Sequence, residues 1–487
     1  MQHTVEKIGG TSMSDYDSVR DNIILNSELG ENIYSRMFVV SAYGGVTDEL
    51  LEHKKTGEPG IYALFAGSTS DSAWRLAFDK LKQKLLAINT QLFGYGTLLD
   101  QANAFITLRL ESALDVLNDL QSLCQHGHFT LQDHLSTVRE MLASIGEVHS
   151  AYNMVQLLNR DGINTTFVDL TAWNAPGHLS LDERIASALQ GVDVHRSLPV
   201  VTGYAHSDTG LMGTFDRGYS EMTFSRLAVV SRAAEAIIHK EFHLSSADPK
   251  LVGEGNAVPI GRTNYDVADQ LANIGMEAIH PKAAKGLRQF DIPLRVKNTF
   301  QPEHAGTLIT KDYVSDSPCV EIVAGCKGVF ALELFDQEMA GSVIEYDHAF
   351  ASLVQRFKAS VITKDMNANT LTYYVSANLK SIKRIASALT DQYADAEVSY
   401  RKVAIVSAFG SDMQVPGLLA KAVSALADND ISVLAMHQGM RQVDMQFVLD
   451  EADYEQAVKS LHSCLVEVLN HGEAIELAPY RMEAEVA

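Results

Sequence analysis

The stretch "VEKIGGTSMS" (residues 5–14) carries a lysine at the end of a strand-like segment and then runs directly into glycines and hydroxyl side chains. Polar and apolar residues alternate from His3 to Ile8 as in a strand, Ser14 can cap a following helix, and "MFVVS" (residues 37–41) has the composition of a buried strand. This order predicts a β-α-β unit. The N–H groups of a glycine-rich turn favour phosphate, and Lys7 adds a positive charge. The alternative for so short a motif is an ordinary turn beside a surface lysine.

A second glycine-rich corner, "AYGGVTDELL" (residues 42–51), leads to a helical start near Thr47. Two such corners predict a mainly parallel α/β sheet with a site at the carboxyl ends of its strands. Residues 51–150 are mostly helical in pattern, which we interpret as a helical excursion from the sheet. Further strands are predicted at residues 165–170, 198–204, 235–240 and 293–298, so that this domain reaches about Thr310.

Beyond this domain the pattern strand, helix, strand, strand, helix occurs twice, starting at Val329 and again at Val403. A repeated unit of this order predicts two small ferredoxin-like domains, which often pair edge to edge. Two unrelated α+β stretches are the alternative.

The composition describes an ordinary globular protein of 487 residues, with 46% hydrophobic and 21% charged residues. The formal charge of -22 argues against a general nucleic-acid binder or an anionic membrane surface as partner. The four cysteines show no C-x-x-C spacing, which favours a reducing, cytoplasmic setting. The sequence predicts neither a signal peptide nor a membrane span.

Neither the P-loop pattern nor the dinucleotide-binding G-x-G-x-x-G pattern occurs, so a nucleotide site must use other residues. In "FDRGYSEMTF" (residues 215–224), Ser220 can cap a helix that has Glu221 in its first turn. Arg217, just before it, can grip a carboxylate through two parallel hydrogen bonds. An ordinary helix with a capping box is the alternative.

Two further stretches can bind ligands. In the loop "SSADPKLVG" (residues 245–253), Asp248 and Lys250 suit the sugar and phosphates of a nucleotide, although such loops are usually turns. Glu147 lies on a segment that we expect to be half buried, so its carboxylate needs a cation from the protein or the ammonium of a ligand. A structural salt bridge is the commoner outcome.

We assign no metal ligands. The trio Cys124, His126 and His128 lacks a fourth ligand nearby, and His280 is interpreted as a helix stop.

Together these motifs resemble, in content and order, those of the aspartate kinases, and the resemblance covers nearly the whole chain. It implies an α/β amino-acid-kinase (carbamate-kinase-like) fold, a three-layer αβα sandwich with a mainly parallel sheet, and two ferredoxin-like ACT domains. The expected limits are 1–312 for the kinase domain, 320–395 for the first ACT domain and 400–472 for the second. The combination of "IIHKEFHLSSADP" with "FDRGYSE" is similar to the aspartate kinases encoded beside ectoine biosynthesis genes in salt-tolerant bacteria. The stretches that carry the family resemblance are "KIGGTS", "VVSAYGGVTDEL", "SIGEVHSA", "DRGYSEMTF", "SSADPKLV", "EAIHPKAA" and "LRVKNTFQPEHAGTLI".

The implied reaction converts L-aspartate and ATP, with Mg²⁺, to 4-phospho-L-aspartate and ADP, the first step of the aspartate pathway. The side-chain carboxylate of aspartate is already ionised near neutral pH, so this chemistry needs no general base. The resemblance also implies a homodimer or higher homo-oligomer through the ACT domains and a possible amino-acid effector. The alternatives are a glutamate-type kinase and a non-catalytic ACT sensor of amino acids.

The resemblance implies three groups of site residues. Lys7 and Glu221 are expected to be catalytic, with Lys7 stabilising the transferring phosphoryl group. The substrate is expected to contact Ser41, Thr47, Glu147 (its ammonium), Arg217 (its α-carboxylate) and Ser220. The nucleotide is expected to contact Lys7, Gly9, Gly10, Ser12, Ser246, Asp248 and Lys250.

The chain departs from the family pattern at several places. The usual R-G-G-S-D reads Arg-Gly-Tyr-Ser-Glu at residues 217–221, the usual T-D pair reads His239-Lys240, and the usual G-A-K-V-L-H-P is changed at residues 275–281. These changes affect the expected contacts with the base and ribose of the nucleotide more than the residues expected to act on the phosphoryl group. Residues 440–442, Met-Arg-Gln, replace an S-S-E that belongs to the effector site in many members, so we expect weak or altered inhibition by lysine and threonine.

Overall fold

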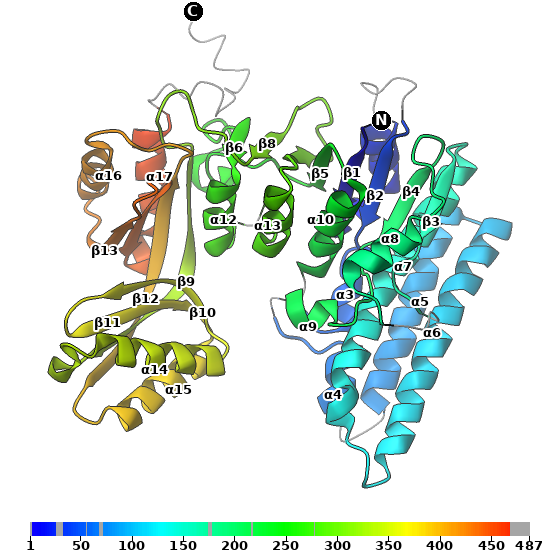
Figure 1. Cartoon of the computed structure of the whole chain (residues 1–487), viewed down its shortest axis with the longest axis horizontal. Helices are drawn as coiled ribbons and strands as arrows, with labels where there is room; N and C mark the ends of the chain where they lie inside the picture. The colour runs from blue at the N-terminus through cyan, green and yellow to red at the C-terminus, as the bar shows by residue number, and fades with distance from the viewer. Residues whose placement is uncertain are drawn as a thin grey trace, which may run out of the picture. The chain divides into compact units, whose positions relative to one another are not determined.

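The computed structural model describes residues 2–25, 33–54, 56–67, 72–173, 178–215, 218–276 and 278–467 (Figure 1). The chain forms two compact units. The first comprises residues 1–243 and 279–310, and the second comprises residues 244–278 and 311–487.

The first unit is built on a mainly parallel sheet, as the sequence predicts. Within this unit the strands follow the order β3-β4-β2-β1-β5-β7-β8, and of the pairings described within it the one between β7 and β8 is antiparallel while the others are parallel. All five residues of β2 and of β4 are buried, because a strand covered on both faces must be apolar almost throughout. The strands are β1 (Thr4–Ile8), β2 (Arg36–Val40), β3 (Thr165–Val168), β4 (Leu198–Thr202), β5 (Glu235–Lys240), β7 (Leu294–Asn298) and β8 (Thr307–Thr310).

Helices cover this sheet and extend beyond it. The predicted helical excursion contains the long helices α5, α6 and α7, which lie side by side in Figure 1. The helices of the unit are α1 (Gly10–Met13), α2 (Tyr16–Ser18), the π-helix η1 (Val19–Ile24), α3 (Val46–Leu50), α4 (Ile61–Gly67), α5 (Ser72–Phe93), α6 (Thr97–Cys124), η3 (Leu131–His134), α7 (Leu135–Arg160), α8 (Leu181–Ala188), α9 (Leu211–Phe215), α10 (Tyr219–Ser231) and α13 (Pro281–Gln289).

The start of the second helix differs from the prediction. Asp15, not Ser14, caps α2, and its carboxylate accepts the N–H of Ser18 at 3.1 Å. The hydroxyl of Ser14 instead donates to the carbonyl of Gly10 at 3.2 Å, because a first short helix already begins at Gly10. The prediction therefore missed one helical turn.

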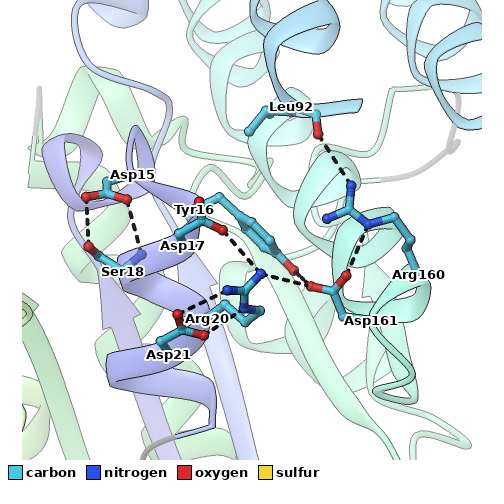
Figure 2. Close-up of polar contacts among 9 residues, drawn as sticks. All are labelled: Asp15, Tyr16, Asp17, Ser18, Arg20, Asp21, Leu92, Arg160 and Asp161. Carbon is cyan, nitrogen blue, oxygen red and sulfur yellow. Dashed lines mark hydrogen bonds and ion pairs between the residues drawn. The ribbon is translucent and has the colours of Figure 1, made fainter. Parts of the chain in front are cut away.

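A polar cluster joins this region to the end of α7 (Figure 2). The hydroxyl of Tyr16 donates to Asp161 at 2.8 Å, and Arg20 lies 3.7 Å from the same carboxylate. Arg20 also pairs with Asp17 at 3.2 Å and with Asp21 at 2.7 Å. The cluster holds η1 beside the loop that follows α7.

The second unit contains a six-stranded antiparallel sheet in the order β10-β11-β9-β12-β14-β13. Both predicted repeats are present in the predicted order, and the long strands β9 and β12 pair with each other, so the two repeats share one sheet. The elements are α11 (Pro249–Val252), β6 (Arg262–Asn264), α12 (Tyr265–Asn273), β9 (Ile322–Phe335), η5 (Gln337–Met339), α14 (Val343–Arg356), β10 (Ser360–Met366), β11 (Thr370–Ser376), α15 (Leu379–Gln392), β12 (Glu397–Phe409), α16 (Leu418–Ala427), β13 (Val433–Gln438), β14 (Asp444–Leu449), η6 (Glu451–Asp453) and α17 (Tyr454–Leu465).

Among the residues that the structure describes, no helix combines the length and the apolar character needed to cross a bilayer.

Candidate active site

The carboxyl ends of three parallel strands of the first unit lie level with one another. Ile8 at the end of β1 pairs with Val40 at the end of β2, and Val40 pairs with Thr202 at the end of β4. The loops that begin at Gly9, Ser41 and Gly203 therefore open at one edge of the sheet, which is where ligands bind in open α/β folds.

The first glycine corner packs tightly against the second. Gly9 caps α1, and its N–H donates to the carbonyl of His239 at 3.3 Å. A Cβ on Gly10 would lie 2.8 Å from the carbonyl oxygen of Ala42, so a side chain there would clash with backbone. Ser12 is buried and lies 3.0 Å, between hydroxyl oxygens, from Thr299.

The ammonium of Lys7 is buried beside a carboxylate. Its Nζ lies 3.9 Å from Oε1 of Glu221, and Oε2 of Glu221 accepts the main-chain N–H of His280 at 2.5 Å. His280 caps the start of α13, so its interpretation as a helix stop is wrong. The two residues that we expected to be catalytic are thus in contact.

The beginning of α10 also corrects a prediction. Its cap is Gly218, and Ser220 is the second residue of the helix. Glu221 lies in the first turn, as predicted. Arg217 lies outside the described residues.

Glu147 is more deeply buried than expected, with 2% of its surface exposed. Its Oε1 accepts the hydroxyl of Tyr219 at 2.5 Å, whereas its Oε2 receives no hydrogen bond from the described residues. Burial raises the pKa of Glu147 to about 7, while the Tyr219 hydroxyl, the backbone amides of Glu147 and Ala42, and the Lys7 charge offset part of that rise. A buried carboxylate with an open oxygen is costly unless a ligand pairs with it.

Gly203 connects Glu147 with Ser220. A Cβ at Gly203 would lie 3.0 Å from Cγ of Glu147, 3.1 Å from Cβ of Ser220 and 2.5 Å from the carbonyl oxygen of Val40. The glycine therefore makes room for both side chains. Sequence reasoning missed Gly203, because the predicted strand at residues 198–204 included it, whereas the observed strand ends at Thr202.

The second corner lies against α7 next to Glu147. The N–H of Ser41 donates to the carbonyl of Ile8 at 3.2 Å, and the hydroxyl of Ser150 on α7 donates to the carbonyl of Ser41 at 2.8 Å. Thr47 is the second residue of α3, which begins after Gly45 in the left-handed region at φ 75°. Ser41 and Thr47 are both partly accessible.

The three nucleotide candidates after β5 belong to the second unit. The carboxylate of Asp248 caps α11 by accepting the N–H of Lys250 at 2.9 Å. Ser246 is buried, with its hydroxyl 2.9 Å from Nε2 of His462 and 3.1 Å from the N–H of Val258. These contacts are those of an ordinary structured loop, so the nucleotide role of the three residues stays a prediction.

His239, where the chain departs from the family pattern, belongs to a buried charge cluster. Its Nε2 lies 2.8 Å from Glu6, which also accepts two hydrogen bonds from Arg36, at 2.6 and 2.9 Å. Although burial opposes ionisation, Arg36 and His239 hold the pKa of Glu6 far below its usual range. Since neighbouring residues of a strand point to opposite faces, Glu6 and Lys7 lie on opposite faces of the sheet. Sequence reasoning did not find this cluster.

In the described parts of the chain, no group of three or more His, Cys, Asp or Glu side chains is arranged to hold a metal ion.

The parallel sheet, its glycine corners, the buried Lys7 and Glu147 and the partly buried Glu221 define a kinase of the amino-acid-kinase type. Residues 2–298 match the amino acid kinase family and residues 406–465 match the ACT domain. The chain belongs to the amino acid kinase family, within the aspartate kinases. It is 54% identical over 476 residues to aspartate kinase Ask_Ect of Stutzerimonas stutzeri, an alignment that covers 98% of this chain and 100% of that protein.

Two solved structures share the fold. The crystal structure of Escherichia coli aspartokinase III in complex with lysine and aspartate has a TM-score of 0.74 and 19% identity, covering 96% of this chain and 100% of the other. The aspartate kinase of Clostridium acetobutylicum has a TM-score of 0.69 and 20% identity, covering 95% of this chain and 100% of the other. Both similarities support the amino-acid-kinase fold.

Proposed function

We propose that this protein transfers the γ-phosphoryl group of ATP to the side-chain carboxylate of L-aspartate, giving 4-phospho-L-aspartate and ADP. One observation carries the proposal. At the ligand-binding edge of the sheet, a buried cation, Lys7, lies close to a buried carboxylate, Glu147, one oxygen of which receives no hydrogen bond from the part of the chain that the structure describes. A phosphoryl acceptor that is also an amino acid needs both groups, one for the transferring phosphate and one for its ammonium.

The chemistry assigns each group a task. Phosphoryl transfer depends mainly on positioning and on neutralising the charge of the transferring group, and Lys7 with the amide of Gly10 supplies that neutralisation. Gly9 contacts the nucleotide beside them, although its own N–H donates to the carbonyl of His239. Glu221 holds Lys7 in place. Mg²⁺ enters with ATP as its phosphate complex.

The substrate and nucleotide contacts are part of the same proposal. Glu147 holds the ammonium of aspartate and Arg217 holds its α-carboxylate, with Ser41, Thr47 and Ser220 beside them. Ser12, Ser246, Asp248 and Lys250 contribute to nucleotide binding.

We further propose the domain limits 1–312, 320–395 and 400–472, and a cytoplasmic homodimer or higher homo-oligomer that pairs through the ACT domains and has a possible amino-acid effector. The pathway served is the supply of aspartate-derived amino acids and ectoine. Size-exclusion chromatography with light scattering tests the oligomer, and a monomer at micromolar concentration would contradict it.

The purified full chain is incubated with ATP, Mg²⁺, hydroxylamine and either L-aspartate or L-glutamate. The expected result is aspartyl hydroxamate with release of ADP, and little product from glutamate. Equal product from glutamate would favour the glutamate-type kinase. No product from either amino acid, together with binding of an amino acid, would favour the non-catalytic sensor.

A further inference from the structure

We propose that Tyr219 is a positioning and specificity-determining residue, whose phenol binds one oxygen of Glu147 so that the other oxygen alone is presented to the substrate ammonium. The inference rests on the proposed function, in which Glu147 receives that ammonium.

The geometry repeats itself along α7. Glu140 and Glu147 are seven residues apart, close to two helical turns, and so lie on one face of the helix. Tyr204 donates to Oε2 of Glu140 at 2.7 Å, and Tyr219 donates to Oε1 of Glu147 at 2.5 Å. The two phenol rings pack edge to face, with centroids 5.7 Å apart. Each carboxylate is therefore held by one phenol of a packed pair.

The two carboxylates differ in which of their oxygens accept hydrogen bonds from the protein. Oε2 of Glu140 also accepts the N–H of Leu211 at 3.1 Å, and Oε1 accepts the N–H of Gly213 at 3.0 Å. Both oxygens of Glu140 are thus used inside the protein. Among the described residues, no donor reaches Oε2 of Glu147, so this oxygen is left for a ligand. The comparison within one helix separates a structural carboxylate from a binding carboxylate.

Tyr219 is well placed to fix this orientation. Only 3% of its surface is exposed, and as the first residue of α10 it lies two positions before Glu221, which contacts Lys7. A buried phenol at the start of a helix has few alternative rotamers, so its hydrogen bond defines the plane of the Glu147 carboxylate.

The groups that face Glu147 determine the effect of removing the phenol. Among the described residues they are Tyr219 from α10, Lys7 from β1, Tyr204 from the loop after β4 and the backbone amides of Ala42 and of Glu147 itself. The Tyr219 hydrogen bond lowers the pKa of Glu147, so its loss raises that pKa and reduces the ionised fraction at neutral pH. Binding of the ammonium then weakens, whereas binding of ATP does not depend on this carboxylate.

The test is Tyr219→Phe in the full chain, with steady-state kinetics from pH 6 to pH 9. We expect the KM for aspartate to rise roughly tenfold, the size of one lost hydrogen bond to a charged group, with kcat and the KM for ATP within about twofold. The acid limb of kcat/KM for aspartate moves to higher pH. Succinate, a dicarboxylate without the ammonium, inhibits with a Ki that changes less than about twofold.

Two further variants sharpen the test. Tyr16→Phe removes a phenol–carboxylate hydrogen bond in the cluster of Figure 2 and should change neither KM nor the pH profile. In the double variant Tyr219→Phe with Glu147→Gln, the KM for aspartate should rise as much as in Glu147→Gln alone, because Tyr219 acts through Glu147.

Several results would overturn the inference. The first is an unchanged KM for aspartate in Tyr219→Phe, and the second is an equal rise of the KM for aspartate and for ATP. The third is a KM for aspartate in the double variant that reflects the sum of the two single effects. The fourth is loss of the folded state in Tyr219→Phe, which would assign the phenol to stability. If the unaltered protein makes no aspartyl hydroxamate, the proposed function fails instead, and the two failures are distinguishable.

Discussion

The Nζ of Lys7 lies 3.9 Å from Oε1 of Glu221, and the other oxygen of Glu221 is held by the N–H of His280. The ammonium thus has an anchored partner. In the proposed reaction this arrangement keeps the Lys7 charge at the edge of the sheet where the phosphoryl group transfers. Lys7 is therefore the first residue to test.

Lys7→Met keeps the length of the side chain and removes its charge. We expect kcat to fall by at least about 10²-fold, the effect typical of removing one electrostatic stabiliser of a transition state. The hydroxamate assay measures kcat, and circular dichroism checks that the fold is kept.

The matched control is Lys327→Met, which removes an exposed ion pair with Glu455 in the second unit. Its turnover should stay within about twofold, since exposed ion pairs contribute little to stability. Undiminished turnover in Lys7→Met would contradict the role of Lys7.

Glu147→Gln should alter both substrate binding and stability. The pKa of Glu147 is raised from 4.5 to about 7 in the fold, so the folded state binds this proton more tightly than the unfolded state does. The unaltered protein therefore loses stability as pH rises from 4.5 to about 7, by up to roughly 3 kcal/mol at ~1.4 kcal/mol per pKa unit. The neutral glutamine avoids that loss.

Urea denaturation at pH 5 and pH 8 measures this difference. Relative to the unaltered protein, the free energy of unfolding of Glu147→Gln should be higher at pH 8 than at pH 5. The KM of this variant for aspartate should rise at least about tenfold. A stability difference that does not change with pH would show that Glu147 does not carry the raised pKa.

Glu6→Gln should destabilise the first unit. Glu6 is buried between Arg36 and His239, and removing one partner of a buried ion pair costs about 3–5 kcal/mol. The pKa of Glu6 is lowered in the fold, so the stability that its ionised carboxylate contributes is present above pH 4.5 and is lost as the pH falls toward the folded pKa. The difference in the free energy of unfolding between the variant and the unaltered protein should be largest near pH 7 and should shrink below about pH 4.5.

The control for this measurement is Glu235→Gln, which removes a partly exposed ion pair with Arg295 at 2.7 Å in the same unit. It should cost less than about 1 kcal/mol. Similar costs for the two variants would count against a dominant role for the buried cluster.

Activity should remain nearly flat as lysine or threonine rises to millimolar concentration. In the second unit, Arg441 lies in the stretch that departs from the family's effector motif, and its guanidinium pairs with Asp266 of α12 at 2.9 Å. An arginine engaged in this way does not reproduce the S-S-E pattern. Clear inhibition by either amino acid in the hydroxamate assay would refute this expectation.

Much of the fold could be predicted because glycine turns, hydrophobic periodicity and repeats are visible in short stretches of the sequence. The glycine corner after Lys7, the alternation of strands and helices, and the repeat that starts at Val329 and Val403 all depend on residues close in sequence. The errors fall at helix ends, at Ser14, Ser220 and His280, where several neighbouring polar side chains can serve as caps and packing selects one.

The sequence by itself determined which chemical groups stand at the ends of the strands, because glycine, lysine and carboxylate positions follow directly from the order of residues. Only the tertiary structure decided how those groups meet. Tyr219 contacts Glu147 across 72 positions and His239 contacts Glu6 across 233, and neither pairing has a local signal. The burial that raises the pKa of Glu147 and the partners that lower the pKa of Glu6 arise only when helices and strands pack together, since desolvation and charge pairing depend on distance in space.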